Sequence, residues 1–167
     1  MYPPTLYAAI PTIPGFEKYD LSSLKKFISS GAVIPNVVIE RWKGINPDIQ
    51  WRNYWGQTES SPVGTTSSPE SFDQKRNAIG IPDTGTAVRV FDDNDQEVPT
   101  GQIGELVIRS AAVMKGYWKK DDLTAKTLAN GWLHTGDLGY MDEEGWVYFV
   151  DRKKDMIKTG GENVSSQ

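Results

Sequence analysis

The sequence predicts an α/β fold in which alternating helix and strand segments are followed by a small antiparallel β-sheet or barrel. Up to about residue 79, helical and strand patterns alternate along the chain, as they do in α/β domains. Beyond Gly80 the pattern changes to short apolar strands separated by turn residues, which is typical of antiparallel sheets. We therefore expect an α/β portion over residues 1–79, an antiparallel β portion over 80–151 and a distinct last segment over 152–167.

Two helices and one strand are expected in the first portion. The first helix is predicted from Asp20 to Ser30, because Asp20 can cap it and the apolar residues that follow fall on one face. The second is predicted from Pro35 to Lys43, where a proline suits the first turn and apolar residues recur one turn apart. Ile49 to Tyr54 has the composition of a strand, and it runs into Gly56.

A long loop, one helix and several short strands are expected in the rest of the chain. Residues from Ser60 to Asn77 are rich in Ser, Thr, Pro and Gly without apolar periodicity, which is the composition of a surface loop. The helix is predicted from Asp121 to Ala129, with an aspartate as its cap and Asn130-Gly131 as its stop. Strands are predicted at Thr86–Phe91, Ile103–Arg109 and Trp146–Val150, the last of them after a turn over Asp142–Gly145.

Composition and charge exclude several classes of function. The 167 residues carry 18 Lys and Arg against 22 Asp and Glu, a net charge of −4, so there is no cationic field to hold nucleic acid or an anionic membrane. The chain contains no cysteine, which excludes disulfide frameworks, thiolate zinc sites and cysteine nucleophiles. No apolar run approaches the ~20 residues of a membrane-spanning helix, and the first residues do not form a secretion signal. We expect a cytoplasmic protein.

The segment from Asn53 to Glu59 follows a predicted strand, at the position where open α/β sheets bind ligands. Trp55 could stack on a purine, Gly56 would let a ligand lie against the backbone, and Thr58 could bond a phosphate oxygen. Glu59 could bind magnesium, which prefers carboxylate oxygen. The alternative is structural, because an aromatic pair at a strand end is often part of a core and a Thr-Glu pair often begins a helix.

A second group of polar residues lies between Gly131 and Val164. Asp137 can accept hydrogen bonds from two hydroxyls, Arg152 offers a planar donor fork, and Gly160-Gly161 lets backbone amides approach a ligand. Neither a Walker loop nor a Gly-x-Gly-x-x-Gly motif occurs, so a nucleotide would have to be held by other means. The combination indicates a polar ligand that carries phosphate.

Other charged residues in this region have simpler interpretations. His134 stands three residues before Asp137, but no serine elbow, second histidine or metal-ligand spacing supports an acid–base pair. The carboxylates at 142–144 indicate a solvated hairpin turn. The lysines between residues 153 and 158 could form a solvated face.

Taken together, these segments resemble the adenylate-forming superfamily of acyl-CoA synthetases, peptide-synthetase adenylation domains and luciferases. The resemblance extends over nearly the whole chain and rests on motifs that occur in the family's order. They are Trp55-Gly56-Gln57-Thr58-Glu59 for the family's Tyr-Gly-x-Thr-Glu, Gly104-Glu105-Leu106 leading to Gly116-Tyr117-Trp118, Thr135-Gly136-Asp137, and Asp151-Arg152 followed by Lys158 to Val164. The resemblance implies that a carboxylate and magnesium-ATP form an acyl-adenylate, whose acyl group the synthetases transfer to coenzyme A.

The resemblance also implies roles for individual residues. Asp137 would hold both ribose hydroxyls, Arg152 would contact the ribose side, and Glu59 would hold magnesium. Thr58 and Glu59 would be the catalytic residues of this chain, and Lys154 falls at the hinge of the family's small C-terminal domain. The ATP and acyl pocket would be lined by Gly31, Ala32, Asn53, Tyr54, Trp55, Gly56, Gln57 and Thr58, and the pantetheine arm of coenzyme A would be approached by Gly160, Gly161, Glu162 and Asn163.

Within the family, the sequence most resembles the medium- and long-chain fatty acyl-CoA ligases, through Tyr19 to Leu24 and Met156 to Val164. Three positions depart from the family pattern. Ser30 and Val33 replace a glycine and a proline, and Trp55 replaces the tyrosine that would stack on adenine. A wider ring at position 55 would still stack, but it would crowd the adjoining acyl tunnel.

The chain resembles an internal portion of the longer family members, from within the large N-terminal domain to just past the hinge. We expect negligible adenylation by this chain alone, because the family's phosphate loop and C-terminal lysine have no counterpart in it. Unpaired strand edges favour self-association. The alternative is a stand-alone nucleotide- or partner-binding module that keeps Asp137 and Arg152 without turnover.

Overall fold

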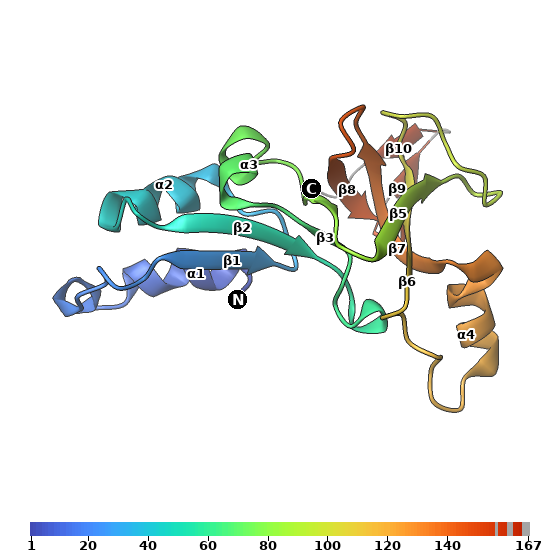
Figure 1. Cartoon of the computed structure of the whole chain (residues 1–167), viewed down its shortest axis with the longest axis horizontal. Coiled ribbons are helices and arrows are strands. Elements are labelled where there is room, and N and C mark those ends of the chain that lie inside the picture. The colour runs from blue at the N-terminus through green and yellow to red at the C-terminus, as the bar shows by residue number, and fades with distance from the viewer. Residues whose placement is uncertain (156, 160–161, 165–167) are drawn as a thin grey trace.

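Two four-stranded sheets organise the residues that the computed structural model describes, which are 1–155, 157–159 and 162–164. The first sheet joins β1 (Lys26–Ser30), β2 (Gln50–Trp55), β3 (Thr65–Thr66) and β4 (Ile81–Pro82), in this order. The second joins β5 (Thr86–Phe91), β6 (Gly104–Ser110), β7 (Leu133–Met141) and β8 (Val147–Arg152). Figure 1 shows the first sheet on the left and the second on the right. This arrangement confirms the predicted fold class, with a second sheet that is open rather than closed into a barrel.

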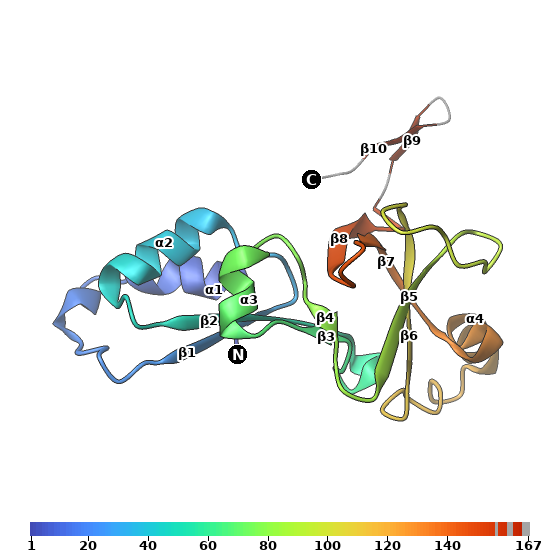
Figure 2. The same ribbon diagram turned by 45° about the horizontal axis from the view of Figure 1, so that its top comes forward.

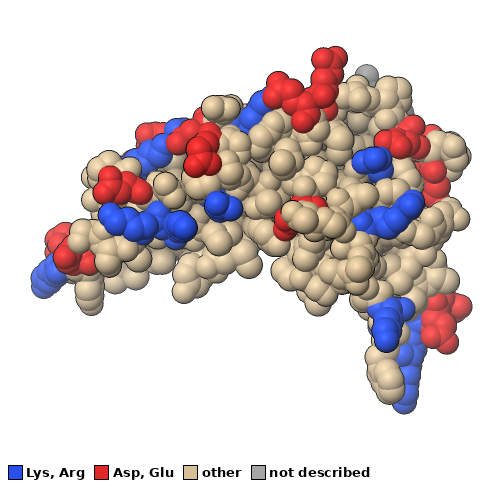
Figure 3. All heavy atoms as spheres, in the orientation of Figure 1, with Lys and Arg blue, Asp and Glu red and all other residues tan. Residues whose placement is uncertain are grey.

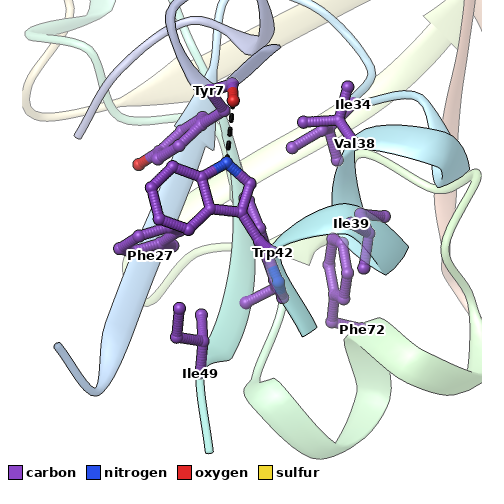
Figure 4. Close-up of a cluster of buried hydrophobic side chains, with 9 residues drawn as sticks. Tyr7, Phe27, Ile34, Val38, Ile39, Trp42, Ile49 and Phe72 are labelled. Atoms are coloured by element: carbon purple, nitrogen blue, oxygen red, sulfur yellow. Dashed lines mark hydrogen bonds between the residues drawn. The ribbon is translucent and has the colours of Figure 1, made fainter. Parts of the chain in front are cut away.

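The first sheet is covered on one face by α1 (Pro4–Ala9), α2 (Asn36–Ile45) and α3 (Pro69–Gln74), as Figure 2 shows. Phe27 of β1 contacts the rings of Trp42 and Trp51, and Trp51 stacks on Phe72 of α3. In Figure 4 the indole nitrogen of Trp42 donates to the carbonyl oxygen of Tyr7, at 2.7 Å. Ring contacts of this kind stabilise beyond the area they bury. This aromatic core supports the strands on which the candidate site is built.

Helix α2 and strand β2 confirm the predictions for residues 35–43 and 49–54. In α2, Val38 and Trp42 lie one turn apart and both are buried. Strand β2 runs parallel to β1, and alternate residues of both strands point to the covered face. Because the two strands are parallel, the residues that follow them meet at one edge of the sheet.

The predicted helix over Asp20–Ser30 is wrong, because the segment forms a turn followed by strand β1. Asp20 Oδ1 accepts a hydrogen bond from the amide of Ser22 at 2.9 Å, which is a local turn rather than a helix cap. The side-chain amide of Asn46 donates to the carbonyl oxygens of Leu21 and Leu24, which a helix would use within its own backbone. Contacts from Asn46 and pairing with β2 therefore override the apolar spacing.

The predicted loop over Ser60–Asn77 is also wrong, because it contains strand β3 and helix α3. Ser68 and Ser71 cap this helix reciprocally, and Pro69 occupies its first turn. Phe72 is its buried contact with the first core. The helix is only six residues long, too short for the recurrence of apolar residues that predicts longer helices. The serines at positions 68 and 71 and the proline at position 69 were the sequence signal that indicated the start of this helix.

The strands of the second sheet are antiparallel, and the three strands predicted in this region are found as β5, β6 and β8. Strand β7 is absent from the sequence-based prediction, because Gly136 and Gly139 interrupt its apolar pattern. Its side chains nevertheless alternate between more and less buried positions. Helix α4 (Asp121–Thr127) is confirmed, but Lys120 takes its cap position without a side-chain bond, so the predicted aspartate cap is wrong.

Backbone pairing joins the two sheets. Gly80 and Val147 form an isolated bridge, in which the amides of Ile79 and Val147 each donate across the junction at 2.8 Å. Lys75 adds an ion pair with Asp142 at 3.2 Å.

The domain boundaries after residues 79 and 151 stay predictions. The short elements are 3₁₀ turns at Ile10–Thr12, Phe16–Lys18, Thr58–Ser60 and Ala129–Gly131, and a hairpin of β9 (Ile157–Thr159) and β10 (Glu162–Val164).

Charged side chains of both signs are interspersed over the described residues of the face in Figure 3, without a large patch of one sign. This distribution agrees with the net charge of −4 and gives that face no field suited to a polyanion. Among the residues that the structure describes, every helix is too short or too polar to cross a lipid bilayer.

Candidate functional site

The segment that follows β2 is held in a tight turn whose backbone admits only glycine at position 56. A Cβ atom built on Gly56 would lie 1.7 Å from the carbonyl oxygen of Pro62, so no side chain fits there. Ser60 Oγ accepts from the amide of Gln57 and donates to its carbonyl oxygen, which closes the turn. Thr58 is exposed and Glu59 is half-buried. The turn thus presents a hydroxyl and a carboxylate beside bare backbone.

Asp137 on β7 is oriented toward this turn by the two residues before it. Thr135 Oγ1 donates to the carbonyl oxygen of Leu106 at 2.6 Å and accepts from the amide of Asp137 at 3.0 Å. Gly136 has a φ of +71°, the left-handed conformation that favours glycine. The Thr-Gly-Asp order therefore supplies an anchor, a bend and a carboxylate.

Asp137 is a buried carboxylate that receives donors from two other segments of the chain. Its Oδ2 accepts from the indole nitrogen of Trp55 at 2.9 Å and, more weakly, from the side-chain amide of Gln57 at 3.4 Å. Arg152 Nε lies 2.9 Å from Oδ1 as an ion pair that lacks the alignment of a hydrogen bond. The side chain of Asp137 is 2% exposed and that of Arg152 is 48% exposed. Two motifs 82 residues apart therefore meet at one carboxylate.

Burial raises the pKa of the Asp137 carboxyl above its ordinary value, and its donors Trp55, Arg152 and Gln57 oppose that shift without cancelling it. Asp137 Oδ1 accepts no aligned hydrogen bond from the described residues. This oxygen is itself buried, and it lies against the half-exposed guanidinium of Arg152.

A groove of about 1070 Å³ gathers many of the predicted site residues. Its walls come from the turn after β2, from strand β7, from helix α4 and from residues 152–154. The volume suits a ligand of the size of a nucleotide. The predicted site residues on its walls are Gly56, Gln57, Thr58, Glu59, Arg152 and Lys154.

A smaller cavity of about 50 Å³ lies at the ends of β1 and β2. Its lining includes the predicted residues Gly31, Ala32, Asn53, Tyr54 and Trp55, together with Arg152. Arg152 also lines the groove, so the two spaces adjoin at its side chain. The parallel pairing of β1 with β2 explains why two segments distant in the sequence share this cavity.

Two buried polar atoms in the lining of the smaller cavity have no hydrogen-bond partner among the described residues. They are Ser29 Oγ and Asn53 Oδ1, which belong to paired positions of β1 and β2. Asn53 Nδ2 donates to the carbonyl oxygen of Ala78 at 2.8 Å, which fixes the amide. Because unpaired buried polar atoms are costly, a polar ligand atom would be favoured here. Ser29 is not among the residues predicted from the sequence, and its place two residues before Gly31 was the available signal.

Glu59 is held by the loop that precedes α4. The hydroxyl of Tyr117 donates to Glu59 Oε1 at 2.7 Å, and the amide of Met114 donates to the carbonyl oxygen of Glu59 at 2.7 Å. Burial and the neighbouring carboxylate raise the pKa of Tyr117, so its hydroxyl keeps the proton that it donates. Nothing in the sequence alone indicates this bond.

The structure around Glu59 bears on the predicted magnesium. Among the described residues, no group of three or more His, Cys, Asp or Glu side chains is placed to hold a metal ion. Magnesium in nucleotide sites is commonly held by one or two carboxylates together with substrate phosphates. Glu59 therefore fits a magnesium ion that arrives with a nucleotide, rather than a resident metal.

The remaining predicted residues have mixed outcomes. Trp55 is 8% exposed and packs in the core of the second sheet, so it is both a core residue and a donor to Asp137, while stacking on a purine stays a prediction. His134 Nδ1 lies 3.5 Å from Glu105 Oε2, and no contact with Asp137 supports an acid–base pair. Lys154 is exposed beside the groove. Gly160 and Gly161 lie outside the described residues, as do the side chains of Glu162 and Asn163, so their roles stay predictions.

Comparison with known proteins agrees with this geometry. Residues 1–118 match the family described as AMP-binding enzyme. The long-chain-fatty-acid–CoA ligase of Escherichia coli O6:H1 is 42% identical over 160 residues, which cover 96% of this chain and 28% of that ligase. The crystal structure of the anthranilate CoA ligase AuaEII in complex with anthranoyl-AMP has a TM-score of 0.87 at 31% identity, covering 98% of this chain and 31% of that one. A Mycobacterium tuberculosis fatty acyl CoA synthetase has a TM-score of 0.81 at 34% identity, covering 98% and 32%.

The chain spans less than a third of the length of each of these proteins. The family match nevertheless includes most of the chain and the turn that presents Thr58 and Glu59, and the structural likeness extends through Asp137 and Arg152. The chain therefore belongs to the family of AMP-binding enzymes.

Proposed function

We propose that this chain forms the nucleotide-binding face and the hinge of an ATP-dependent acyl-CoA ligase. In the first step, a carboxylate oxygen attacks the α-phosphorus of magnesium-ATP and pyrophosphate leaves. In the second step, the thiol of coenzyme A attacks the acyl carbonyl and AMP leaves. Adenylation lowers the barrier to thiol attack, because AMP is a far better leaving group than hydroxide. Family membership and the two ligases described above support this reaction class.

The observation that carries the proposal is the meeting of Asp137, Arg152 and Trp55 beside the groove. A carboxylate with one oxygen that accepts no aligned hydrogen bond suits a ribose diol, whose hydroxyls can donate to it. The Arg152 side chain is 48% exposed, so its remaining donors can reach ribose or phosphate oxygens.

The turn after β2 would act on the phosphate side of the nucleotide. The exposed hydroxyl of Thr58 donates to a phosphate oxygen, and Glu59 gives one oxygen ligand to the magnesium of magnesium-ATP. Bare backbone at Gly56 allows close approach. These groups position the phosphates and balance their charge, which is the main task of a protein in phosphoryl chemistry. Lys154 would be the hinge, and residues 160–163 would receive the pantetheine arm of coenzyme A.

A medium- or long-chain fatty acid is the acyl substrate that we propose, on the strength of the sequence resemblance and of the E. coli ligase. An aromatic carboxylate is the alternative, because AuaEII is an anthranilate CoA ligase with a high structural similarity. The cavity at the ends of β1 and β2, of about 50 Å³, has Trp55 in its wall and would have to open for a long chain. Acyl-adenylate mimics can therefore distinguish the two substrates.

Ribose recognition tests the nucleotide part of this proposal. Calorimetric titration of the 167-residue chain with AMP, 2′-deoxy-AMP and 3′-deoxy-AMP compares ligands that differ by one hydroxyl. We expect each lost hydroxyl to weaken binding about 10- to 100-fold, since a hydrogen bond to a charged group contributes about 1.5–3 kcal/mol. Asp137→Asn should weaken AMP and bring the three affinities together. Asp48→Asn, at an exposed position outside the groove, is the control and should change nothing.

Equal binding of AMP and its deoxy analogues by the unaltered chain would contradict the ribose assignment. For the acyl group, sulfamoyl analogues of acyl-adenylates resist hydrolysis, and those with longer aliphatic chains should bind more tightly than the anthranoyl analogue. Tighter binding of the anthranoyl analogue would overturn the fatty-acid assignment and leave the nucleotide assignment standing.

A further inference from the structure

The carboxylate of Glu105 connects the residues next to both members of the Asp137–Arg152 pair. Glu105 lies on β6 and is largely buried, and its Oε1 accepts a hydrogen bond from the amide of Gly136 at 2.9 Å. Its Oε2 accepts from Nζ of Lys153 at 3.2 Å. Gly136 precedes Asp137 and Lys153 follows Arg152, so one side chain restrains a neighbour of each.

A backbone hydrogen bond closes this arrangement into a ring. The amide of Lys153 donates to the carbonyl oxygen of Gly136 at 2.8 Å. Nζ of Lys153 also lies 2.9 Å from Asp93 Oδ1, in the turn after β5. Partial burial alone would lower the pKa of Lys153, but its bonds to Asp93 and Glu105 outweigh burial and raise the pKa. Lys153 is therefore a charged donor held by both its backbone and its side chain.

The ties to the second sheet are made by Arg152 and Lys153. The side chain of the next residue, Lys154, is exposed and makes no ion pair with the described residues. The amide of Asp155 donates to the carbonyl oxygen of Arg152 at 3.0 Å, so Lys154 lies in a turn that begins at the tied residues. The contacts of Lys153 with Glu105, Asp93 and Gly136 do not involve Lys154.

We propose that Glu105 is a positioning residue that locks Lys153 onto the turn at Gly136, so that the following segment pivots at Lys154 while the Asp137–Arg152 pair stays in place. The inference rests on the proposed function, in which this pair holds the ribose and Lys154 is the hinge. Glycine has the greatest backbone freedom of any residue, so the turn at Gly136 depends on such a restraint. A lock of this kind keeps the nucleotide bound while the hinge moves between the two steps of the reaction.

Amide hydrogen exchange, measured by NMR on the chain without ligand, tests the lock. Glu105→Gln keeps the shape of the side chain and an acceptor oxygen for the Gly136 amide, but it removes the charge that holds Lys153. We expect exchange at the amides of Gly136 and Lys153 to accelerate about tenfold, because charge-assisted bonds are lost. Lys153→Met keeps the apolar stem and should accelerate its own amide by a similar factor. Glu97→Gln removes an exposed ion pair with Arg89 and is the matched control, which should leave both amides unchanged.

The double variant shows whether the two side chains act through one another. If they form one lock, Glu105→Gln and Lys153→Met together accelerate exchange at the Lys153 amide no more than either change alone. Unchanged exchange at that amide in both single variants, with the β6 amides still protected, would overturn the proposal. If Glu105→Gln does not fold, Lys153→Met alone decides, by the same criterion.

Nucleotide affinity separates the lock from the proposed function. Glu105→Gln should weaken AMP several-fold and reduce the preference for AMP over 2′-deoxy-AMP, because the pair that holds the ribose loses its support. Absence of AMP binding by the unaltered chain would defeat the proposed function, and the exchange rates would still decide whether the lock exists. Faster exchange with unchanged AMP affinity would overturn the positioning role of Glu105.

Discussion

Replacing Trp55 by phenylalanine tests whether its indole supports the buried charge of Asp137. The indole nitrogen donates to Asp137 Oδ2 at 2.9 Å, and the side chain of Asp137 is 2% exposed. A hydrogen bond to a charged group contributes about 1.5–3 kcal/mol, and the lost ring volume costs about 1 kcal/mol more. We therefore expect Trp55→Phe to lower the free energy of unfolding at neutral pH by about 2.5–4 kcal/mol.

Trp51 offers a matched control on the same strand. Its indole nitrogen is buried and has no hydrogen-bond partner among the described residues. Trp51→Phe removes a similar volume but also relieves an unpaired donor, whose burial costs about 1–3 kcal/mol. The relief equals or exceeds the cost of the lost volume, so we expect the free energy of unfolding to rise by about 0–2 kcal/mol. Neither effect depends on the charge of Asp137, so the pH dependence of the difference between the two variants isolates the bond to Asp137.

The loss in Trp55→Phe should depend on pH. Burial raises the pKa of Asp137, and the indole bond opposes that shift. Between the ordinary pKa of about 3.9 and the raised folded value, the folded state holds the proton more tightly than the unfolded state, so stability falls as pH rises through this window. Removing the indole raises the folded pKa further and extends the window upward. The variant therefore loses more stability at neutral pH than at about pH 4, where a larger fraction of the folded chain has Asp137 protonated.

Urea unfolding followed by circular dichroism at both pH values measures these differences. The gap between Trp55→Phe and Trp51→Phe should be about 2.5–6 kcal/mol at neutral pH, and it should narrow by about 1–2 kcal/mol as the pH falls and the bond to the charged carboxylate becomes a bond to a neutral one. For a chain of this length, the larger gap corresponds to roughly 5–24 °C in melting temperature. Equal losses, or a gap that does not change with pH, would refute the argument that the indole stabilises the charged carboxylate.

Two further pairs of substitutions test the turn after β2. Gly56→Ala should prevent the native turn, because its Cβ would lie 1.7 Å from the carbonyl oxygen of Pro62. The control is Gly44→Ala in helix α2, where a Cβ would meet nothing within 4 Å and should stabilise the chain by about 0.5–1 kcal/mol. Equal melting temperatures for the two variants would contradict the close approach at Gly56. Tyr117→Phe should cost about 1 kcal/mol by removing the donor to Glu59. This loss should not add to that of Glu59→Ala, because both changes remove the same bond, and additive losses in urea unfolding would contradict the contact.

Helices and strands whose conformation depends on their own residues could be predicted from the sequence. Elements whose conformation depends on contacts with distant residues could not. Helix α2 is ten residues long with buried residues one turn apart, so its pattern is sufficient. The segment before β1 was misread, because its deciding contacts come from Asn46, 22 and 25 residues away. Strand β7 was hidden by glycines that its packing requires, since a Cβ on Gly139 would lie 2.2 Å from the carbonyl oxygen of Tyr148. In both cases tertiary contacts outweigh the local pattern.

The members of the candidate site could be predicted, whereas their connections could not. The motifs single out Trp55, Asp137 and Arg152 one by one, but the pairing of Asp137 with Arg152 follows from the register of β7 with β8. The bond from Trp55 follows from the way the end of β2 meets that hairpin, across 82 residues. Position 55 departs from the family pattern, and the sequence suggested only a wider ring for stacking. The indole of Trp55 donates to the buried carboxylate of Asp137, and a phenylalanine could not make this hydrogen bond. Substitutions at position 55 therefore change the pKa of Asp137 even when no ligand is bound.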